Sequence, residues 1–415
     1  MSVEGWKTKA LGSVAEIIMG QSPDSRYYSE EEIGLPFLQG CAEFTSKFPS
    51  AVLFCSQVKK IARTGSILFS VRAPVGRTNL TDTDYIIGRG LAALIASQIS
   101  QDYLHHYLVY SESGFRNNSQ GSTFEAINSK ELRDWAISFP EFLQEQTQIA
   151  TILSTIDRAI EQTEALIAKQ QRIKTGLMQD LLTKGIDENG NIRSEETHDF
   201  KDSPLGRIPV EWEVEKIEQK LERIIDYRGQ TPKKVTEGIP LLTAKNVRDG
   251  FIEKEPQEFI ADSAYNSWMS RGIPEVGDVL FTTEAPMGNV ASIPNYRIAL
   301  AQRLLTLCPK INELSQDFLF WILHWKRSKE RIELLTSGST VVGIKQSVFR
   351  KVIFAFPSYN EQERIYAVLN SHDEINKNEK HKLKKLQRLK TGLMQDLLTG
   401  KVRVTDILNQ KAAVN

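Results

Sequence analysis

Two different spacings of apolar residues alternate along this chain. Between residues 6 and 140, short apolar runs are separated by glycine, proline and asparagine, a pattern typical of strands and turns. From residue 146 the apolar positions take up helical spacing and keep it to about residue 182. The pattern predicts a strand-rich mixed α/β domain followed by one long helix.

The same succession returns in the second half of the chain. Residues 171–183, QRIKTGLMQDLLT, are repeated at 387–399 with a single change from isoleucine to leucine. Shorter strings match in the same order: GQSP with GQTP, APVG with APMG, and GST with GST. A repeat of about half the chain length indicates a duplicated domain and helix rather than a short solenoid repeat.

Changes in composition divide the chain into six parts. They are an N-terminal domain (1–145), a first long helix (146–184), a polar linker (185–211), a C-terminal domain (212–361), a second long helix (362–400) and a tail (401–415). The expected fold class is α+β, with two similar mixed α/β domains, two long helices and an internal pseudo-two-fold repeat.

Both long helices carry a broad apolar stripe that suits packing on more than one neighbour. The second helix has three polar residues at its middle, His372, Asn376 and Glu379, so we expect its centre to be hydrated or paired with polar groups. Each helix also contains a glycine, Gly176 or Gly392, which costs about 1 kcal/mol relative to alanine. These glycines indicate either close approach of another helix or a local break.

Composition places the chain among globular proteins. Hydrophobic residues make up 40% and charged residues 25%, and the apolar runs are far shorter than a membrane span. With no apolar leader pattern at the N-terminus, we expect a protein of the cytoplasm without a membrane segment. Its three cysteines lack CxxC spacing and its six histidines lack HExxH spacing, so neither a disulfide framework nor a metal site is predicted.

The charge balance does not by itself predict a nucleic-acid ligand. Lysine and arginine together number 52, as do aspartate and glutamate, whereas DNA-binding proteins usually carry a basic excess. If DNA is the ligand, the basic residues must gather on one face, or a partner must neutralise part of the phosphate charge.

The order of domain, helix ending in KTGLMQDLLT, linker, domain and repeated helix resembles the specificity subunit of type I restriction-modification enzymes. The match covers nearly the whole chain. Its most specific part is the paired KTGLMQDLLT block, supported by a GST string followed by Ile127 in one half and Ile344 in the other.

This resemblance implies two target recognition domains, each reading one half of a split double-stranded DNA sequence. It implies that the two helices form an antiparallel coiled coil that holds these domains apart. A helix spanning 146–182 is roughly 55 Å long, enough to place two domains about one DNA turn apart. The resemblance also implies two docked modification subunits, which bring S-adenosylmethionine and adenine methylation, and restriction subunits that join through them.

The matching loops supply candidate DNA contacts. The GQSP and GQTP loops can offer backbone N–H groups and hydroxyls to phosphate, although an ordinary turn also needs glycine and proline. The residues flanking APVG and APMG differ between the copies, which favours base readout because arginine pairs with guanine and asparagine with adenine. A solvated turn is the alternative there, and a flexible loop tip is the alternative for the polar run at 116–120.

The candidates share a place in or beside these loops. They are Ser22, Arg72, Arg77, Arg116, Asn117, Asn118, Gln120, Arg228, Gln230, Thr231, Lys233, Lys234, Asn289 and Lys345.

The repeated block supplies candidate partner contacts, because its apolar residues exceed what one two-helix seam can bury. We expect the modification subunits to cover some of them. They are Leu177, Met178, Leu181, Leu182, Leu393, Met394, Leu397 and Leu398.

Catalytic signatures are missing from the sequence. There is no Asn/Asp-Pro-Pro-aromatic tetrad, no glycine-rich S-adenosylmethionine loop and no phosphate-binding GxxxxGK string. We therefore expect a non-catalytic subunit that holds no cofactor itself. Two alternatives remain: a coiled-coil assembly scaffold without direct DNA readout, and a DNA methylase or nuclease with unrecognised motifs.

Overall fold

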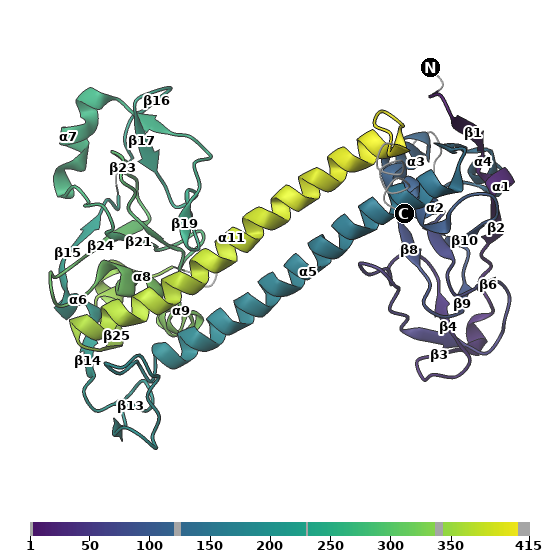
Figure 1. Cartoon of the computed structure of the whole chain (residues 1–415). Coiled ribbons are helices and arrows are strands. Elements are labelled where there is room, and N and C mark those ends of the chain that lie inside the picture. The colour runs from purple at the N-terminus through teal and green to yellow at the C-terminus, as the bar shows by residue number, and fades with distance from the viewer. Residues whose placement is uncertain (1–2, 120–125, 230, 337–342, 406–415) are drawn as a thin grey trace. The chain divides into compact units, whose positions relative to one another are not determined.

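The computed structural model describes residues 3–119, 126–229, 231–336 and 343–405. The chain divides into two compact units, called unit 1 (1–166 with 380–415) and unit 2 (167–379). Two long helices, α5 (Leu143–Leu181) and α11 (Tyr359–Leu398), are shared between the units (Figure 1). Each unit therefore contains one domain, the start of one long helix and the end of the other.

Unit 1 is built from two sheets and a strand pair. A four-stranded sheet has the order β2-β10-β7-β8, a five-stranded sheet has the order β3-β5-β4-β9-β6, and β1 pairs with β11. The strands are β1 (Trp6–Ala10), β2 (Ala15–Met19), β3 (Tyr28–Ser29), β4 (Leu35–Leu38), β5 (Leu53–Cys55), β6 (Ile61–Ala62), β7 (Ile67–Ser70), β8 (Thr78–Leu80), β9 (Tyr85–Ile87), β10 (Leu91–Ala96) and β11 (Ala136–Pro140). The short helices are α1 (Leu11–Val14), α2 (Gln101–Tyr110), α3 (Glu112–Ser119) and α4 (Ser129–Asp134).

Unit 2 repeats this plan, with a four-stranded sheet in the order β15-β24-β21-β22 and a second in the order β16-β20-β17-β23. Its strands are β12 (Phe200–Lys201), β13 (Ile208–Pro209), β14 (Glu213–Lys216), β15 (Leu221–Asp226), β16 (Lys234–Val235), β17 (Ile239–Leu242), β18 (Val247–Arg248), β19 (Phe251–Ile252), β20 (Phe259–Ile260), β21 (Val279–Thr282), β22 (Val290–Ser292), β23 (Ala299–Leu300), β24 (Leu304–Pro309) and β25 (Ile353–Phe356). The short helices are α6 (Ile217–Lys220), α7 (Tyr265–Trp268), α8 (Gln316–His324), α9 (Lys326–Glu333) and α10 (Gln346–Phe349). The expected pair of similar mixed α/β domains is confirmed.

Strand directions bring matching loops to one edge of each four-stranded sheet. In unit 1, β10 runs antiparallel to both β2 and β7. The carboxyl ends of β2 and β7 and the amino end of β10 therefore lie at the same edge, called here the loop edge. In unit 2, β24 is antiparallel to β15 and β21, so those three strands form an equivalent loop edge.

Each long helix has in its first turn a buried glutamate, which binds an arginine from beyond the end of the other long helix. In unit 1, Glu145 accepts hydrogen bonds from Arg403 through Nε at 2.6 Å and Nη2 at 2.8 Å. In unit 2, Arg193 donates to Glu361, with 3.2 Å between Nη2 and Oε2. Both carboxylates are almost fully buried, so these paired, charge-assisted contacts satisfy groups that would be costly to leave alone.

The glutamine that follows each glutamate joins the helix start to its own domain. Gln146 accepts the backbone N–H of Ser100, the N-cap of α2, and Gln362 accepts that of Ser315, the N-cap of α8, each at 2.8 Å. Both glutamines also donate to a proline carbonyl, that of Pro140 at the end of β11 and that of Pro357 just after β25. These tethers lie in the first turn, and both helices begin three residues before the expected starts (143 against 146, 359 against 362).

The segment expected to be a linker is part of the core of unit 2. Ile186 and Ile208 are buried in the same apolar cluster as Trp212, and Arg193 is 8% exposed in its pair with Glu361. The segment 185–211, expected as a polar linker, thus contributes buried residues to unit 2. They hold the end of α5 within unit 2.

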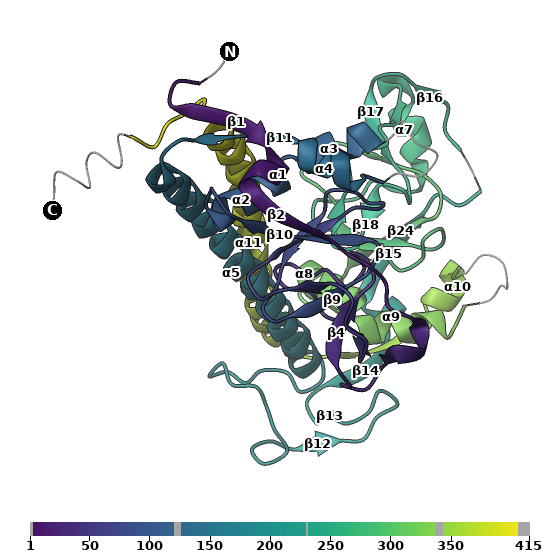
Figure 2. The ribbon, with the colours of Figure 1, turned by 90° about the vertical axis from the view of Figure 1, so that its right-hand side faces the viewer.

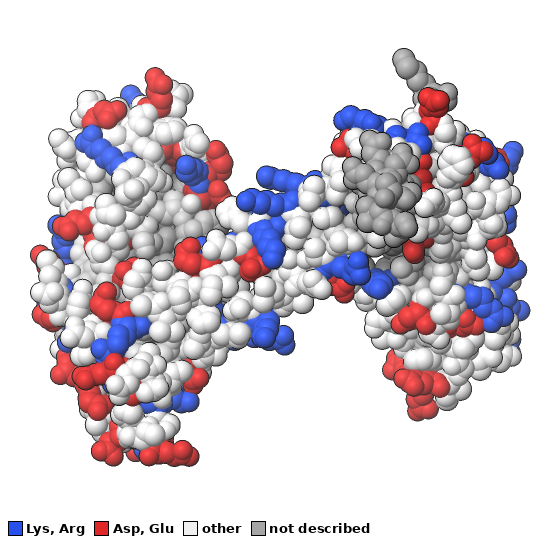
Figure 3. Space-filling view, viewed as in Figure 1, with Lys and Arg blue, Asp and Glu red and all other residues white. Residues whose placement is uncertain are grey.

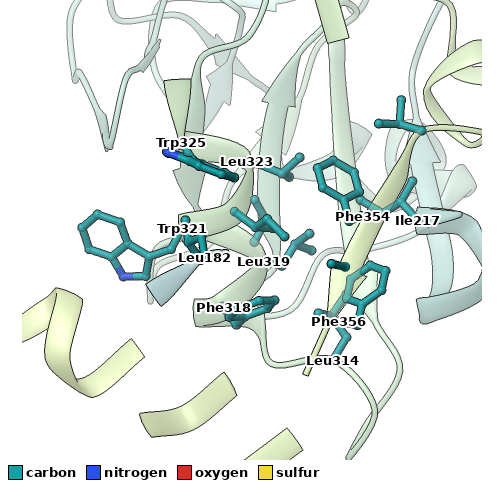
Figure 4. Packing of buried hydrophobic residues seen from close by; sticks show 14 of the residues in the cluster. Leu182, Ile217, Leu314, Phe318, Leu319, Trp321, Leu323, Trp325, Phe354 and Phe356 are labelled. Atoms are coloured by element: carbon teal, nitrogen blue, oxygen red, sulfur yellow. The ribbon is translucent and has the colours of Figure 1, made fainter. Parts of the chain in front are cut away.

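One face of the repeated block packs inside each unit. In unit 2, Met178, Leu181 and Leu182 are buried in one cluster with α8 and the start of α11, and Figure 4 shows Leu182 beside Trp321 and Leu319. In unit 1, Met394, Leu397 and Leu398 are buried in the same way with the start of α5, while Leu177 and Leu393 are partly buried against these clusters. We expected modification subunits to cover some of these eight residues, and six of the eight are already covered by the domain at the end of each helix.

Each unit contains the same ion pair between the two long helices, which run side by side (Figures 1 and 2). Lys174 pairs with Asp373 in unit 2, and Lys390 pairs with Asp157 at 2.6 Å in unit 1. Burial by itself would raise the pKa of Asp373, but hydrogen bonds from Lys174 and Lys377 outweigh it and hold that pKa below its usual value. Both pairs join the end of one helix to the start of the other, so the helices are antiparallel within each unit.

The polar centre expected for α11 includes one buried amide. Asn376 is 3% exposed, and neither polar atom of its side chain has a hydrogen-bond partner in the described part of the chain. An unsatisfied buried amide costs about 1 to 3 kcal/mol. The equivalent residue of α5 is Ile160, which carries no such cost, so α5 is the better helix for pairing with a second copy of itself.

We predict that a fragment of residues 1–202 forms a dimer. The end of α5 carries the same apolar residues as the end of α11, so it can fill the same cluster in a second copy, with Lys174 meeting Asp157 and Arg193 meeting Glu145. Each buried leucine contributes roughly 1.5 to 3 kcal/mol, enough for association at roughly tens of micromolar. Light scattering gives the mass, Met178→Asp should yield monomers, and a folded wild-type fragment that stays monomeric would contradict the prediction.

Candidate nucleic-acid interface

The loop edge of unit 1 collects four segments that are distant in the sequence. The GQSP loop is held by hydrogen bonds from Gly20 N to Leu91 O and from Gln21 N to Ile87 O, both 2.9 Å. The segment that follows β7 is held by a hydrogen bond of 2.9 Å from Val71 N to Gly90 O. The chain returns to this point after the undescribed residues 120–125, where Arg72 forms a bridge with Ala126.

Three arginines are exposed at this edge, Arg72, Arg77 and Arg89. None of them forms an ion pair with another described residue, so all three can meet a polyanion. Arg89 was missed by sequence reasoning. Its only signal in the sequence is its position between two glycines just before an apolar strand. The pairing of β10 with β2 and β7 is needed to show that this position lies at the loop edge.

Two further candidates in unit 1 are engaged within the protein. The hydroxyl of Ser22 accepts from the backbone N–H of Arg89 at 3.2 Å and from Gln39 Nε2 at 2.9 Å, so it fixes the loop. Arg116 is exposed and forms an ion pair with Glu112 one helical turn away. Asn117 is exposed on α3, the side chain of Asn118 is not described, and Gln120 lies outside the described residues.

The loop edge of unit 2 has the same framework with different side chains. Thr283 N donates to Arg303 O and Ile344 N donates to Thr283 O, each at 3.0 Å, and Glu284 forms a bridge with Gly343. Exposed cationic and hydroxyl side chains surround this point. They are Arg228, Thr231, Lys233, Arg303 and Lys345.

Several of these residues also have contacts within the chain. Arg228 Nη2 donates weakly to the carbonyl of Ile344 at 3.4 Å, and Lys234 pairs with Glu258 at 2.7 Å. Gln230 lies outside the described residues. Lys234 is therefore the least available of the cations predicted for this loop.

Asn289, which was predicted as a base contact, has a structural role within the domain. Its side-chain nitrogen donates to the carbonyl of Val247 at 2.8 Å, and its backbone N–H donates to the hydroxyl of Thr282 at 2.9 Å. The amide thereby ties the APMG turn to β18. Sequence comparison of the two copies could not distinguish this role from readout.

Charge is mixed over the protein surface. On the face drawn in Figure 3, acidic and basic side chains are interspersed over both domains, and basic side chains gather along the middle of the long helices. The described residues include no cluster of three or more histidine, cysteine, aspartate or glutamate side chains placed to hold a metal. None of the described helices has the length and apolar character needed to cross a membrane.

Two similar domains that present different side chains on one loop framework define a duplicated binding protein. A family model described as the type I restriction modification DNA specificity domain matches the chain twice, over residues 3–170 and 209–388. The chain belongs to this family.

Two proteins of the archaeon Methanocaldococcus jannaschii are similar to this chain in sequence. The putative type I restriction enzyme MjaX specificity subunit is 38% identical over 187 residues, which is 44% of each chain, so this match spans less than half of that relative. The type I restriction enzyme MjaVIII specificity subunit is 27% identical over 316 residues, 74% of this chain and 71% of the relative.

Solved structures share the fold. The S subunit of a type I restriction-modification system from M. genitalium has a TM-score of 0.62 at 16% identity, and covers 95% of this chain and 96% of its own. A chain from a study of assembly of the type I restriction-modification system has a TM-score of 0.57 at 19% identity, covering 97% of this chain and all of its own.

We predict opposite consequences for the two residues that follow APVG and APMG. Asn289→Ala should lower the free energy of unfolding by about 1 to 3 kcal/mol, because the buried carbonyl of Val247 loses its donor. Arg77→Ala, at the equivalent exposed position, should change it by less than about 0.5 kcal/mol. Denaturant unfolding of the full chain measures both, and equal stabilities for the two variants would show that the Asn289 contact contributes nothing.

Proposed function

We propose that this chain is the specificity subunit of a type I restriction-modification complex, and that each domain reads one half of a split double-stranded DNA site. The observation that carries the proposal is the duplicated loop edge. One backbone framework presents Arg72 and Arg77 in unit 1 but Glu284 and Asn289 in unit 2. Conserved geometry with divergent side chains suits two domains that read different sequences.

The long helices support a site with a fixed, unread spacer. α5 is one continuous helix of 39 residues, about 58 Å at 1.5 Å per residue, and α11 has 40. Continuous helices tethered at both ends by buried ion pairs resist changes in length. The two half-sites would then lie a set number of base pairs apart.

The chemistry of such a complex would come from other subunits. S-adenosylmethionine and adenine methylation belong in the modification subunits of this proposal, and restriction subunits join through them. The chain itself contributes recognition and assembly, and it acts in the cytoplasm, where it meets DNA. The family membership and the absence of catalytic motifs in the sequence support this division of roles.

Mapping of methylated adenines tests the proposed function. Genomes of the host with and without this gene are sequenced for base modification, with the modification gene left intact. We expect one class of bipartite sites to lose methylation throughout the genome when the gene is removed. Methylation that persists at every site would exclude this chain as the specificity subunit.

The buried positions of the repeated block move the expected docking surface to its exposed side. Ile173 and Leu389 occupy equivalent positions of the two helices and are 36% and 50% exposed. One turn further along lie Gly176 and Gly392, where an added Cβ atom would meet nothing within 4 Å. Glycine is thus retained twice at exposed helical positions where the chain itself has room for alanine.

Close approach of another protein explains both glycines. Glycine lowers helix stability by about 1 kcal/mol relative to alanine, so its duplication at a site without internal crowding indicates an external neighbour. An exposed apolar residue with a glycine one turn further along occurs once on each long helix. Two modification subunits would therefore dock, one against Ile173 and Gly176 and one against Leu389 and Gly392.

We predict opposite effects on folding and on assembly at these glycines. Gly176→Ala with Gly392→Ala should raise the free energy of unfolding of the isolated chain by about 1 kcal/mol per site, through helix propensity. The same variant should capture less modification subunit in a pull-down, and leucine at both sites should abolish capture.

Gln171→Leu is the matched control, because residue 171 is exposed on the same helix about 140° around from Gly176. It places an exposed leucine on another face of the same helix and should leave capture unchanged. Full capture by the double leucine variant would place the docking surface elsewhere.

A further inference from the structure

Arg303 has a backbone conformation that arginine rarely adopts. Its φ is +73°, in the left-handed region that favours glycine. Thr283 N donates to Arg303 O in unit 2 just as Val71 N donates to Gly90 O in unit 1, so the two residues occupy equivalent positions. A side chain is therefore held in unit 2 at a place where unit 1 has glycine. Strained residues retained in this way gather at functional sites.

A carboxylate holds the Arg303 side chain at the loop edge. Arg303 Nε lies 2.7 Å from Glu284 Oε1, and the Arg303 side chain stays 51% exposed. Glu284 is itself fixed by its backbone bridge to Gly343. No hydrogen bond joins the terminal nitrogens of Arg303 to any other described residue, so they form an open fork of donors.

Both units have an arginine where two paired strands meet at the loop edge, β7 and β10 in unit 1 and β21 and β24 in unit 2, but on different strands of the pair. At the exit of β7, unit 1 has Arg72 where unit 2 has Glu284, and unit 1 has Gly90 where unit 2 has Arg303. Of these two paired positions, each unit has an arginine at one: after β7 in unit 1 and before β24 in unit 2. The exchange changes the strand that carries the arginine, and therefore the direction from which it approaches a ligand.

The neighbouring carboxylate distinguishes a base contact from a phosphate contact. A phosphate at the Arg303 fork would be repelled by Glu284, since like charges at this range oppose each other. Guanine O6 and N7 are neutral acceptors, and they match the paired donors of a guanidinium. The arrangement favours the base edge over the backbone.

We propose that Arg303 is a specificity-determining residue, which reads a guanine in the half-site of the C-terminal domain through its two terminal nitrogens. Glu284 is its positioning residue. This assignment rests on the proposed function and goes beyond it by naming one base contact. As the proposed base contact of this domain, Arg303 also replaces Asn289, whose side-chain amide donates to the carbonyl of Val247.

Arg303→Gly tests the assignment in the full chain assembled with its modification subunits. The variant restores the residue of unit 1 and relieves the left-handed strain, so the melting temperature should rise. Affinity for the wild-type site should fall roughly 5- to 150-fold, the equivalent of about 1 to 3 kcal/mol. Methylation mapping should show that one G·C position of the C-terminal half-site is no longer required, while the other half-site is unchanged.

Three further variants sharpen the result. Arg303→Lys keeps the charge but loses the fork, so it should relax the same position, as should Glu284→Gln, which weakens the hold on the side chain. Arg297→Ala removes an exposed arginine that is paired with Asp262, away from the loop edge, and should leave the methylated site unchanged.

The outcomes separate this assignment from the proposed function. An unchanged motif with Arg303→Gly overturns the assignment. Weaker binding to all sequences with an unchanged motif also overturns it, because that is the behaviour of a phosphate contact. A wild-type complex that methylates no defined motif would overturn the proposed function together with this assignment.

Discussion

Reciprocal docking of the two long helices underlies the organisation of both units. The end of α5 is buried in unit 2 and the end of α11 is buried in unit 1, in each case against the start of the other helix. A buried glutamate at each start binds an arginine that follows the other helix. Removal of one partner would leave an uncompensated buried charge, so each contact requires the segment that follows the other long helix to be in place.

This docking explains why one stretch is repeated almost unchanged while the domains diverge. Residues of the repeated block must fit an apolar cluster and align Lys174 or Lys390 with an aspartate. These demands on adjacent helical positions allow little variation. The loop edges have a weaker packing demand, because most of their candidate side chains are exposed and the two units share the backbone framework.

DNA recognition and the packing of the long helices therefore rest on different interactions in the same chain. Helix packing depends on apolar burial and paired charges, and neither depends on which DNA sequence is bound. Recognition depends on exposed donors held at set positions, as Glu284 holds Arg303. The equal numbers of acidic and basic residues fit this division, since the cations that matter are placed locally and need no basic excess overall.

The amino-acid sequence was enough to establish the duplication, the two strand-rich domains and the two long helices, because periodic apolar patterns and an almost identical repeat report local structure directly. It also identified the GQSP, APVG and GST segments as places of interest. It could not assign roles to single residues there. Asn289 and Arg77 match in the repeat, yet the tertiary structure ties only Asn289 to a carbonyl of β18.

The folded arrangement was needed to learn what buries the apolar residues of the repeated block and which side chains meet at the loop edge. A helical apolar pattern shows that Leu181 and Leu397 must be covered, but not by what. Elements far away in the sequence cover them: α8 packs with Leu181, and α2 and strands of unit 1 pack with Leu397. Arg89 and Arg303 reach the edge because antiparallel pairing of distant strands brings them there. Such positions depend on non-local contacts, and a one-dimensional pattern holds no record of those contacts.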